Sequence, residues 1–253
     1  MTNIARVCAA LIFMIVVAGH LRPHSVSVDQ VSLNLHLHAT DISDTLLAIP
    51  LERVYNSRSA FKGMFGVGWG SNLETWLEPM TNGDITVHHY GSGKSVRFVN
   101  HNPTADMKQQ ITVLFRSPIV SGVATCTNEY ILSAIHDFLR NESVFHHPVR
   151  KDIALRLTKE GFEYTAQKDD EMLVFNKHGQ LIKIKKNNIT LEVIRNKKRQ
   201  ISGLSTNGIA RIAVKYNGNG RPAMLSHDGT AIVIYEIDQM GRLISVKYDN
   251  RLY

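Results

Sequence analysis

Apolar and polar residues alternate along the second half of the chain. Every second residue is apolar in residues 189–193, 212–216 and 232–234. A period of two is typical of strands that bury one face. Residue pairs that favour type I′ turns lie between and after these runs, because such turns need two residues at positive φ. The pairs are Asn187-Asn188, Asn207-Gly208, Asp228-Gly229 and Asp249-Asn250.

The hairpins predicted in this way form a repeat. Four units, aligned on Gly179, Lys198, Gly220 and Gly241, follow one another at spacings of 19 to 22 residues. A single hairpin cannot bury its own apolar face, so stacked neighbours must bury it together. The sequence therefore predicts a mainly β fold, built as a curved antiparallel ribbon of β-hairpin repeats. The apolar residues four positions before the anchors are Phe175, Ile194, Tyr216 and Ile237.

Further strands are expected upstream of the repeat. Residues 31–38 alternate strictly, residues 41–43 read as a turn, and residues 46–55 read as a strand. Pro50 lacks the donor that a central strand needs, which favours an edge position. Other predicted strands cover residues 85–90, 95–99, 153–157, 162–166 and 172–175. The β segment before the repeat thus spans residues 28–100, and the repeats span residues 151–253.

Residues 101–150 interrupt this pattern and are interpreted as an insertion. Residues 110–115 are compatible with a strand. Residues 128–140 are predicted to form one short helix, because their apolar residues follow helical spacing. Thr127 is expected to cap that helix. The apolar positions of the helix are Ile131, Leu132, Ile135, Phe138 and Leu139.

The N-terminus resembles an export signal. Arg6 precedes an apolar run over residues 7–18, which is too short to span a bilayer. We interpret residues 1–18 as a signal peptide, with cleavage possible up to residue 27; a buried N-terminal strand is the alternative. The expected location is periplasmic, cell-surface or secreted, with no stable membrane span after cleavage. Removal of Cys8 would leave Cys126 without an intrachain disulfide partner.

Two stretches resemble the Rhs family of YD-repeat proteins. The first is Tyr216-Asn-Gly-Asn-Gly220-Arg, together with Gly241-Arg-Leu243 and Tyr248-Asp249. The second is Ile49-Pro-Leu-Glu-Arg-Val-Tyr-Asn-Ser-Arg58, followed by Gly63-Met-Phe-Gly66-Val-Gly-Trp69. It is similar to the segment that opens the Rhs repeat region.

This resemblance implies a fold and a role. In that family the repeats wind into a hollow shell, so this chain would be a shell fragment. The implied role is toxin delivery or encapsulation, or interaction at a cell surface. The implied partner is a toxin domain or a further repeat-containing chain. The sequence leaves open whether the chain is a short relative, a gene remnant or the first part of a longer protein.

Positive charge is concentrated in one part of the chain. The net charge is +7, and residues 176–216 hold ten Lys or Arg against one Glu. Such a block could bind acidic glycans or other envelope polyanions. Nucleic acid is not expected, because few aromatic residues accompany the basic ones. Lysines also protect strand edges from pairing, which is the structural alternative. The candidate polyanion-binding residues are Lys183, Lys185, Lys186, Arg195, Lys197, Lys198 and Arg199.

Other candidate sites carry less chemistry. His36 and His38 share one strand face, but no third metal ligand is identifiable. The loop from Gly66 to Gly70 lacks the Lys-Ser/Thr of a phosphate-binding loop, and we interpret it as a glycine corner packed by Trp69 and Trp76. We expect no metal and no cofactor.

An enzyme using Cys126 is a further hypothesis. Cys126 precedes the predicted helix, whose dipole could lower the pKa of the thiol, and His136, His146 and His147 lie nearby in sequence. A thiol that merely packs beneath the helix is the alternative. The sequence favours a non-enzymatic exported scaffold of the Rhs/YD-repeat type. A binding module for acidic glycans, using the basic face of the repeats, is the second interpretation.

Overall fold

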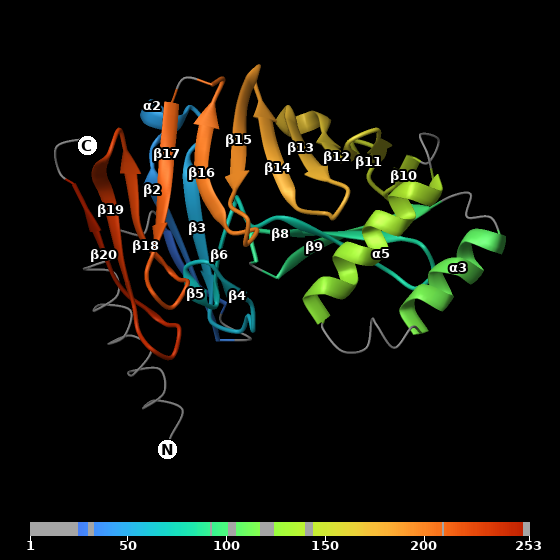
Figure 1. Ribbon diagram of the computed structural model, residues 1–253, viewed down its shortest axis with the longest axis horizontal. Helices are drawn as coiled ribbons and strands as arrows, with labels where there is room; N and C mark the ends of the chain where they lie inside the picture. The colour runs from blue at the N-terminus through green and yellow to red at the C-terminus, as the bar shows by residue number, and fades with distance from the viewer. Residues whose placement is uncertain are drawn as a thin grey trace. The chain divides into compact units, whose positions relative to one another are not determined.

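The computed structural model describes residues 25–29, 33–91, 93–100, 105–116, 124–139, 144–208 and 210–249. The protein is mainly β, and consecutive strands pair in an antiparallel manner, as the sequence predicts (Figure 1). The chain divides into two compact units. Unit 1 consists of residues 1–72, 90–92 and 195–253, and unit 2 of residues 73–89 and 93–194.

Unit 1 contains a four-stranded sheet in the order β1-β2-β3-β6, with a two-residue pair, β4 and β5, beside it. The short helix α2 (Asp44–Leu47) connects β2 to β3. The strands are β1 (Ser25–Asp29), β2 (Asn34–Ile42), β3 (Leu51–Asn56), β4 (Lys62–Gly63), β5 (Gly66–Val67) and β6 (Trp69–Ser71).

The repeat strands of unit 1 form a ladder in which each strand pairs with the next along the chain. The ladder packs against segments that flank the first sheet of the unit. The Thr206 hydroxyl donates to the Leu47 carbonyl of α2 at 2.6 Å, and Phe65, between β4 and β5, packs on Tyr235 with ring centroids 5.0 Å apart. The strands are β16 (Ile201–Thr206), β17 (Ala210–Tyr216), β18 (Pro222–His227), β19 (Thr230–Ile237) and β20 (Leu243–Tyr248).

Unit 2 is also a ladder of sequential antiparallel strands. Its described elements outside the ladder are helix α3 (Ala105–Arg116), helix α5 (Ala124–Leu139) and the 3₁₀ turn η1 (Gln167–Asp169). The strands are β7 (Trp76–Pro79), β8 (Ile85–His89), β9 (Lys94–Asn100), β10 (Val144–His146), β11 (Ile153–Thr158), β12 (Gly161–Ala166), β13 (Glu171–Asn176), β14 (Leu181–Lys186) and β15 (Ile189–Arg195).

The predicted turn pairs lie at the hairpin bends. Both residues of Asn187-Asn188 have positive φ (48° and 63°), and so do both residues of Asn207-Gly208 and of Asp228-Gly229. These pairs connect β14 to β15, β16 to β17 and β18 to β19. The hairpin prediction is confirmed at these three bends, while the Asp249-Asn250 pair extends outside the described residues.

The prediction of a strand at residues 110–115 is wrong, because these residues lie in helix α3. Ile111 is buried against Ile131 and Ile135 of α5, and Leu114 and Phe115 pack on the same cluster. The apolar residues of α3 thus recur at helical spacing. The described part of the insertion therefore contains two helices, α3 and α5, where the sequence predicts one.

Helix α5 begins earlier than predicted. It starts at Ala124, so Thr127 is inside the helix and cannot be its N-cap. Cys126 lies in the first turn of α5, not ahead of it. The side chain of Cys126 is outside the described part of the structure, as is residue 140, the predicted end of the helix.

Two predictions near residue 45 are wrong. Asp41 does not lie in a turn, because β2 continues to Ile42. Residues 46–50 are not a strand: α2 ends at Leu47, Ala48 has a φ of 61°, and β3 begins only at Leu51. Pro50 precedes that strand, and β3 lies between β2 and β6, not at an edge. The predicted signal peptide over residues 1–18, with Cys8, is outside the described residues.

The anchor of the second repeat also needs correction. Gly179, Gly220 and Gly241 have φ values of 77°, 72° and 86°, and the residue that shares this conformation in the second unit is Arg199, at 63°. Lys198 is therefore one position off. With Arg199 as anchor, the spacings become 20, 21 and 21 residues.

Candidate functional site: a buried polar network and the turns of the repeat

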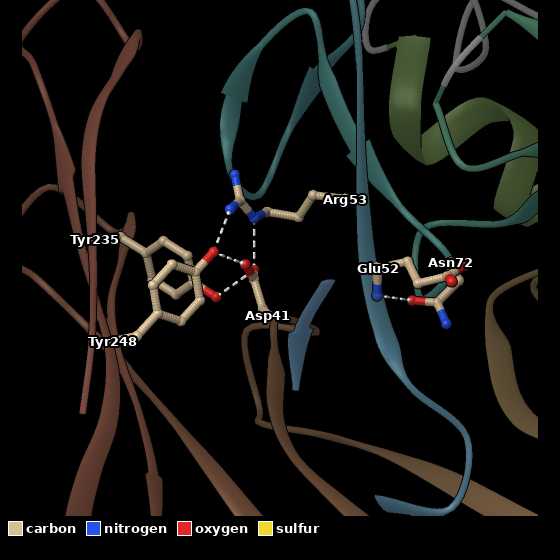
Figure 2. A network of polar contacts seen from close by, with 6 residues as sticks. All are labelled: Asp41, Glu52, Arg53, Asn72, Tyr235 and Tyr248. Atoms are coloured by element: carbon tan, nitrogen blue, oxygen red, sulfur yellow. Dashed lines mark hydrogen bonds and ion pairs between the residues drawn. The ribbon is translucent and has the colours of Figure 1, made fainter. Parts of the chain in front are cut away.

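A buried polar network in unit 1 joins the first sheet to the last hairpin (Figure 2). The Oδ2 atom of Asp41 accepts hydrogen bonds from Arg53 Nε and from the Tyr235 hydroxyl, both at 2.5 Å. Its Oδ1 atom accepts a bond from the Tyr248 hydroxyl at 3.0 Å. Arg53 Nη2 in turn donates to the oxygen of Tyr248 at 3.2 Å. One carboxylate thus binds groups from β3, β19 and β20.

The ion pair at the centre of this network is shielded from solvent. The side chains of Asp41 and Arg53 are both 0% exposed. The guanidinium lies over three aromatic rings, at 4.8 Å from the centroid of Trp69, 5.5 Å from Phe65 and 5.7 Å from Tyr235. Cation–π attraction of this kind is strongest where water is excluded. The rings therefore help to compensate the desolvation of the buried charge.

The network shifts the pKa of its arginine and of both tyrosines. Burial alone would lower the pKa of Arg53, but the charge and hydrogen bond of Asp41 raise that pKa above its ordinary value. Burial, followed by the nearby carboxylate, raises the pKa of Tyr235 well above 10 and also raises the pKa of Tyr248. Both phenols therefore remain protonated donors, and Arg53 remains charged. This arrangement suits a permanent structural contact better than proton transfer.

Asn72 supports the strand that carries Arg53. The Glu52 backbone N–H donates to Asn72 Oδ1 at 3.1 Å, as Figure 2 shows. The side-chain amide of Asn72 donates to the Pro50 carbonyl at 2.7 Å. These bonds connect the segment after β6 to the start of β3.

The glycine-rich loop is a close contact between backbones. A Cβ atom on Gly66, whose φ is +111°, would lie 2.5 Å from the carbonyl oxygen of Gly241. The neighbouring Val67 N–H donates to that same oxygen at 2.8 Å. The interpretation of this loop as a glycine corner is thereby supported, and Trp69 packs within it on Tyr55 at 5.1 Å. Trp76 belongs to unit 2, where it stacks on His88.

Each repeat contains the same five-residue turn, which an Asn or Asp side chain organises. In the turn that begins at Asn217, the side-chain oxygen accepts the N–H groups of Asn219 and Arg221, both at 3.0 Å. The Asn217 N–H donates to the Arg221 carbonyl, and the Gly220 N–H donates to the Asn217 carbonyl. The same backbone bonds form in all four turns, which begin at Asn176, Asn196, Asn217 and Asp238.

The predicted polyanion-binding residues fall into two groups. Lys183, Lys185 and Lys186 lie on β14 in unit 2, where Lys183 forms an ion pair with Glu192 at 3.3 Å. The other four belong to the stretch from Arg195 to Arg199 in unit 1, at the bend that follows β15. Lys197, Lys198 and Arg199 are exposed there.

A cleft of about 460 Å³ adjoins the first group in unit 2. Lys185 and Lys186 line it together with Asp170 and Glu171, so opposite charges balance at its rim. This balance does not favour an anionic ligand. The exposed bend is the better candidate for polyanion binding.

The histidines singled out in the sequence have local partners. His36 is 2.8 Å from Asn34 Nδ2, and His38 is 3.6 Å from a Glu52 oxygen. His136 Nε2 lies 2.9 Å from the Thr158 carbonyl oxygen. Among the described residues, no group of three or more His, Cys, Asp or Glu side chains could hold a metal ion. No helix in the described part of the chain has the length and hydropathy that a membrane span requires.

The comparisons with known proteins give one match, to a family model. No curated protein matches the sequence. The buried pair of Asp41 and Arg53, the glycine corner and Asn72 all lie within one stretch of the chain. That stretch, residues 27–98, matches the family model of a domain of unknown function, DUF6531.

Proposed function

We propose that this chain is a non-enzymatic, exported β scaffold of the Rhs/YD-repeat type. It acts through its surfaces, as part of a shell. The role of that shell is either the delivery or encapsulation of a toxin, or interaction at a cell surface. The partner of this chain is a toxin domain or a further repeat-containing chain. The domain that matches residues 27–98 is often found in YD-repeat and Rhs proteins, which supports this proposal.

The buried network is the observation that carries the proposal. The strongest interactions of Arg53 and Asp41 hold two parts of one unit together, and neither side chain reaches solvent. A catalytic group must be accessible to its substrate, whereas both of these side chains are 0% exposed. Tyr248 belongs to the one literal Tyr-Asp pair of the repeat, and its hydroxyl is used for this internal contact. The network therefore serves as a structural contact between the first sheet and the last hairpin.

The position of β1 refines the proposal of export. β1 pairs with β2 along its whole length, from Ser25 to Asp29. Cleavage after Ala18 would leave this strand complete. Cleavage at residue 27 would remove three of its five residues, so we favour the earlier site.

Fractionation of cells that produce the full chain with a C-terminal tag tests export and processing. The expected product lies outside the cytoplasm, and its intact mass corresponds to a start near residue 19. The matched control lacks residues 2–18 and stays in the cytoplasm. A full-length mass with a cytoplasmic location would contradict export. A circular dichroism spectrum dominated by helix would contradict the scaffold itself.

Binding of acidic glycans is a second candidate function. The bend after β15 presents Lys197 and Lys198 as exposed side chains, for which no ion pair is found among the described residues. Arg195 Nη1 donates to the Arg199 carbonyl at 3.0 Å, which stabilises this bend. A rigid bend with several exposed cations is suited to a polyanion.

Retention on a heparin column tests this second candidate. The Lys197→Ala/Lys198→Ala/Arg199→Ala variant should elute at clearly lower salt than the wild type. The matched control removes the same number of charges in unit 2, as Lys183→Ala/Lys185→Ala/Lys186→Ala. Equal losses in the two variants would show that retention reports net charge and not a site.

A further inference from the structure

Successive turns in unit 1 are linked to one another through the residue that follows the anchor. Gln200 Nε2 donates to the Gly220 carbonyl of the next turn at 3.2 Å. Arg221 repeats this arrangement with two bonds, from Nη1 to the Asp238 carbonyl and from Nη2 to the Gln239 carbonyl, the latter at 3.2 Å. Each turn thus binds main-chain oxygens of its neighbour.

Arg242 occupies the corresponding position in the last described turn. Its Nε donates to Asp238 Oδ2 at 2.7 Å, which holds the side chain within its own turn. The side chain is 68% exposed, and its terminal nitrogens have no acceptor in the described part of the chain. Arg242 is therefore oriented by its own turn while most of its donors face solvent.

The strand that follows Arg242 has one side with no strand partner among the described residues. β20 pairs with β19 and ends the strand order of its sheet among the described residues. Lysine and proline commonly block such edges. β20 contains no proline, and its one lysine, Lys247, is bonded to Glu236 of β19 at 2.7 Å. Ile244 of β20 is 59% exposed.

We propose that the edge of β20 together with Arg242 is a docking surface for a β-hairpin of another polypeptide that carries the same five-residue Asn/Asp turn. The incoming strand pairs with β20 in an antiparallel manner. The guanidinium of Arg242 then donates to the first two carbonyls of the incoming turn, as Arg221 does to Asp238 and Gln239. The contact continues an interface that unit 1 already uses between its own turns.

Recognition at this surface is mostly by main chain. Strand addition supplies affinity through backbone hydrogen bonds, while side-chain pockets supply specificity. Here the turn supplies specificity, because its first two carbonyl oxygens lie together where one guanidinium can bind both, as Arg221 does with Asp238 and Gln239. The inference depends on the repeat geometry and not on export or polyanion binding.

The test measures binding of a labelled peptide that copies residues 230–248 to the full-length chain by fluorescence anisotropy. This peptide contains β19, the turn from Asp238 to Arg242 and β20, so it is the unit that the chain already docks beside Arg221. We expect saturable binding, which Arg242→Ala weakens about tenfold through loss of charge-assisted bonds. Lys198→Ala is the control, because it removes an exposed charge from another turn and should leave binding unchanged.

A second peptide separates turn recognition from general strand addition. In it the five-residue turn is replaced by Asn-Gly, which preserves a hairpin but removes the carbonyl pair. It should bind the wild-type chain about as weakly as the first peptide binds the Arg242→Ala variant. Equal binding of both peptides, or the absence of binding, would overturn the proposal. Self-association that Arg242→Ala abolishes, without peptide binding, would identify a whole second copy as the occupant and would also overturn it.

Discussion

Removal of the Asp41 carboxylate should strongly destabilise unit 1. In the Asp41→Ala variant, Arg53 remains buried without its counter-ion, and the hydroxyls of Tyr235 and Tyr248 lose their acceptor. A fully buried guanidinium cannot recover hydration unless the surrounding structure opens. The variant thus creates an uncompensated charge in addition to a small cavity.

The magnitude follows from the burial of the pair. Breaking a buried ion pair by removing one partner costs roughly 3–5 kcal/mol. For a urea dependence of about 2 kcal/mol per M, the unfolding midpoint should fall by roughly 2 M. Replacing both partners by apolar residues, as in Asp41→Leu/Arg53→Met, leaves no unpaired charge. That double variant should lose much less stability than the single one.

Tryptophan fluorescence during urea unfolding can follow unit 1 alone. Trp69 lies 4.8 Å from the Arg53 guanidinium, while Trp76 belongs to unit 2. A Trp76→Phe background therefore leaves one reporter, next to the network. The matched control is Lys247→Ala, which breaks an exposed ion pair and should cost less than about 1 kcal/mol. If Asp41→Ala costs no more than this control, the reasoning about the network is refuted.

Three other changes test separate features. Gly66→Ala should cost more than about 2 kcal/mol, because its Cβ would collide with the Gly241 carbonyl oxygen, whereas Gly208→Ala, also at positive φ but with open space around it, should cost only about 1 kcal/mol. Arg199→Gly should raise the stability of unit 1 by about 1 kcal/mol, because it relieves a left-handed backbone, and an unchanged urea midpoint would contradict this. Burial lowers the pKa of His89 to about 4, with help from its positive neighbours. In the unfolded chain the pKa of this histidine is about 6.5, so the free energy of unfolding of unit 2 should fall by up to roughly 3 kcal/mol as the pH falls from 6.5 through 4. Urea titrations at several pH values measure this loss, and the His89→Phe variant should not show it.

Local chemistry made part of the fold predictable. Asn-Gly and Asp-Gly pairs specify type I′ bends through their own backbone preferences, whatever lies elsewhere in the chain. For this reason the bends at Asn207 and Asp228 were predictable from sequence, and the bend at Asn187 through the weaker Asn-Asn pair. The five-residue turns were harder to align, because glycine at the left-handed position is replaceable by Arg199. The Asn or Asp that begins each turn is the more reliable marker, since its side chain accepts the backbone donors.

A short apolar run predicts the wrong type of secondary structure at residues 110–115, a strand in place of helix α3. The run around Ile111 is compatible with a strand, because periodicity alone cannot distinguish a short buried strand from a helix segment. The packing partner decided the outcome: Ile131 and Ile135 of α5 bury the helical face of α3. The exact start of α5 was missed for a related reason, since helix ends depend on contacts as well as on capping residues.

The sequence contains a signal for the buried network, namely charged residues at buried positions of two strands. The prediction of a turn at residues 41–43 hides this signal at Asp41. Leu35, Leu37 and Ala39 are buried at alternate positions of β2, and the next position in the same phase is Asp41. Arg53 likewise follows buried Leu51 by two positions on β3. A charge in the apolar phase of a strand needs a partner inside the protein. Two such charges of opposite sign, on the neighbouring strands β2 and β3, would have predicted the ion pair.

The tyrosines could not have been found in the same way. Tyr235 and Tyr248 lie 194 and 207 residues from Asp41 along the chain, and Tyr216 of the repeat likewise lies on a strand. Tyr216, however, donates its hydroxyl to the Ile201 carbonyl within the ladder. Only the docking of β2 and β3 on the last hairpin selects which hydroxyls face the carboxylate. The first sheet and the last hairpin of unit 1 therefore stabilise each other: Asp41 and Arg53 gain their bonds to Tyr235 and Tyr248 only once β19 and β20 are in place.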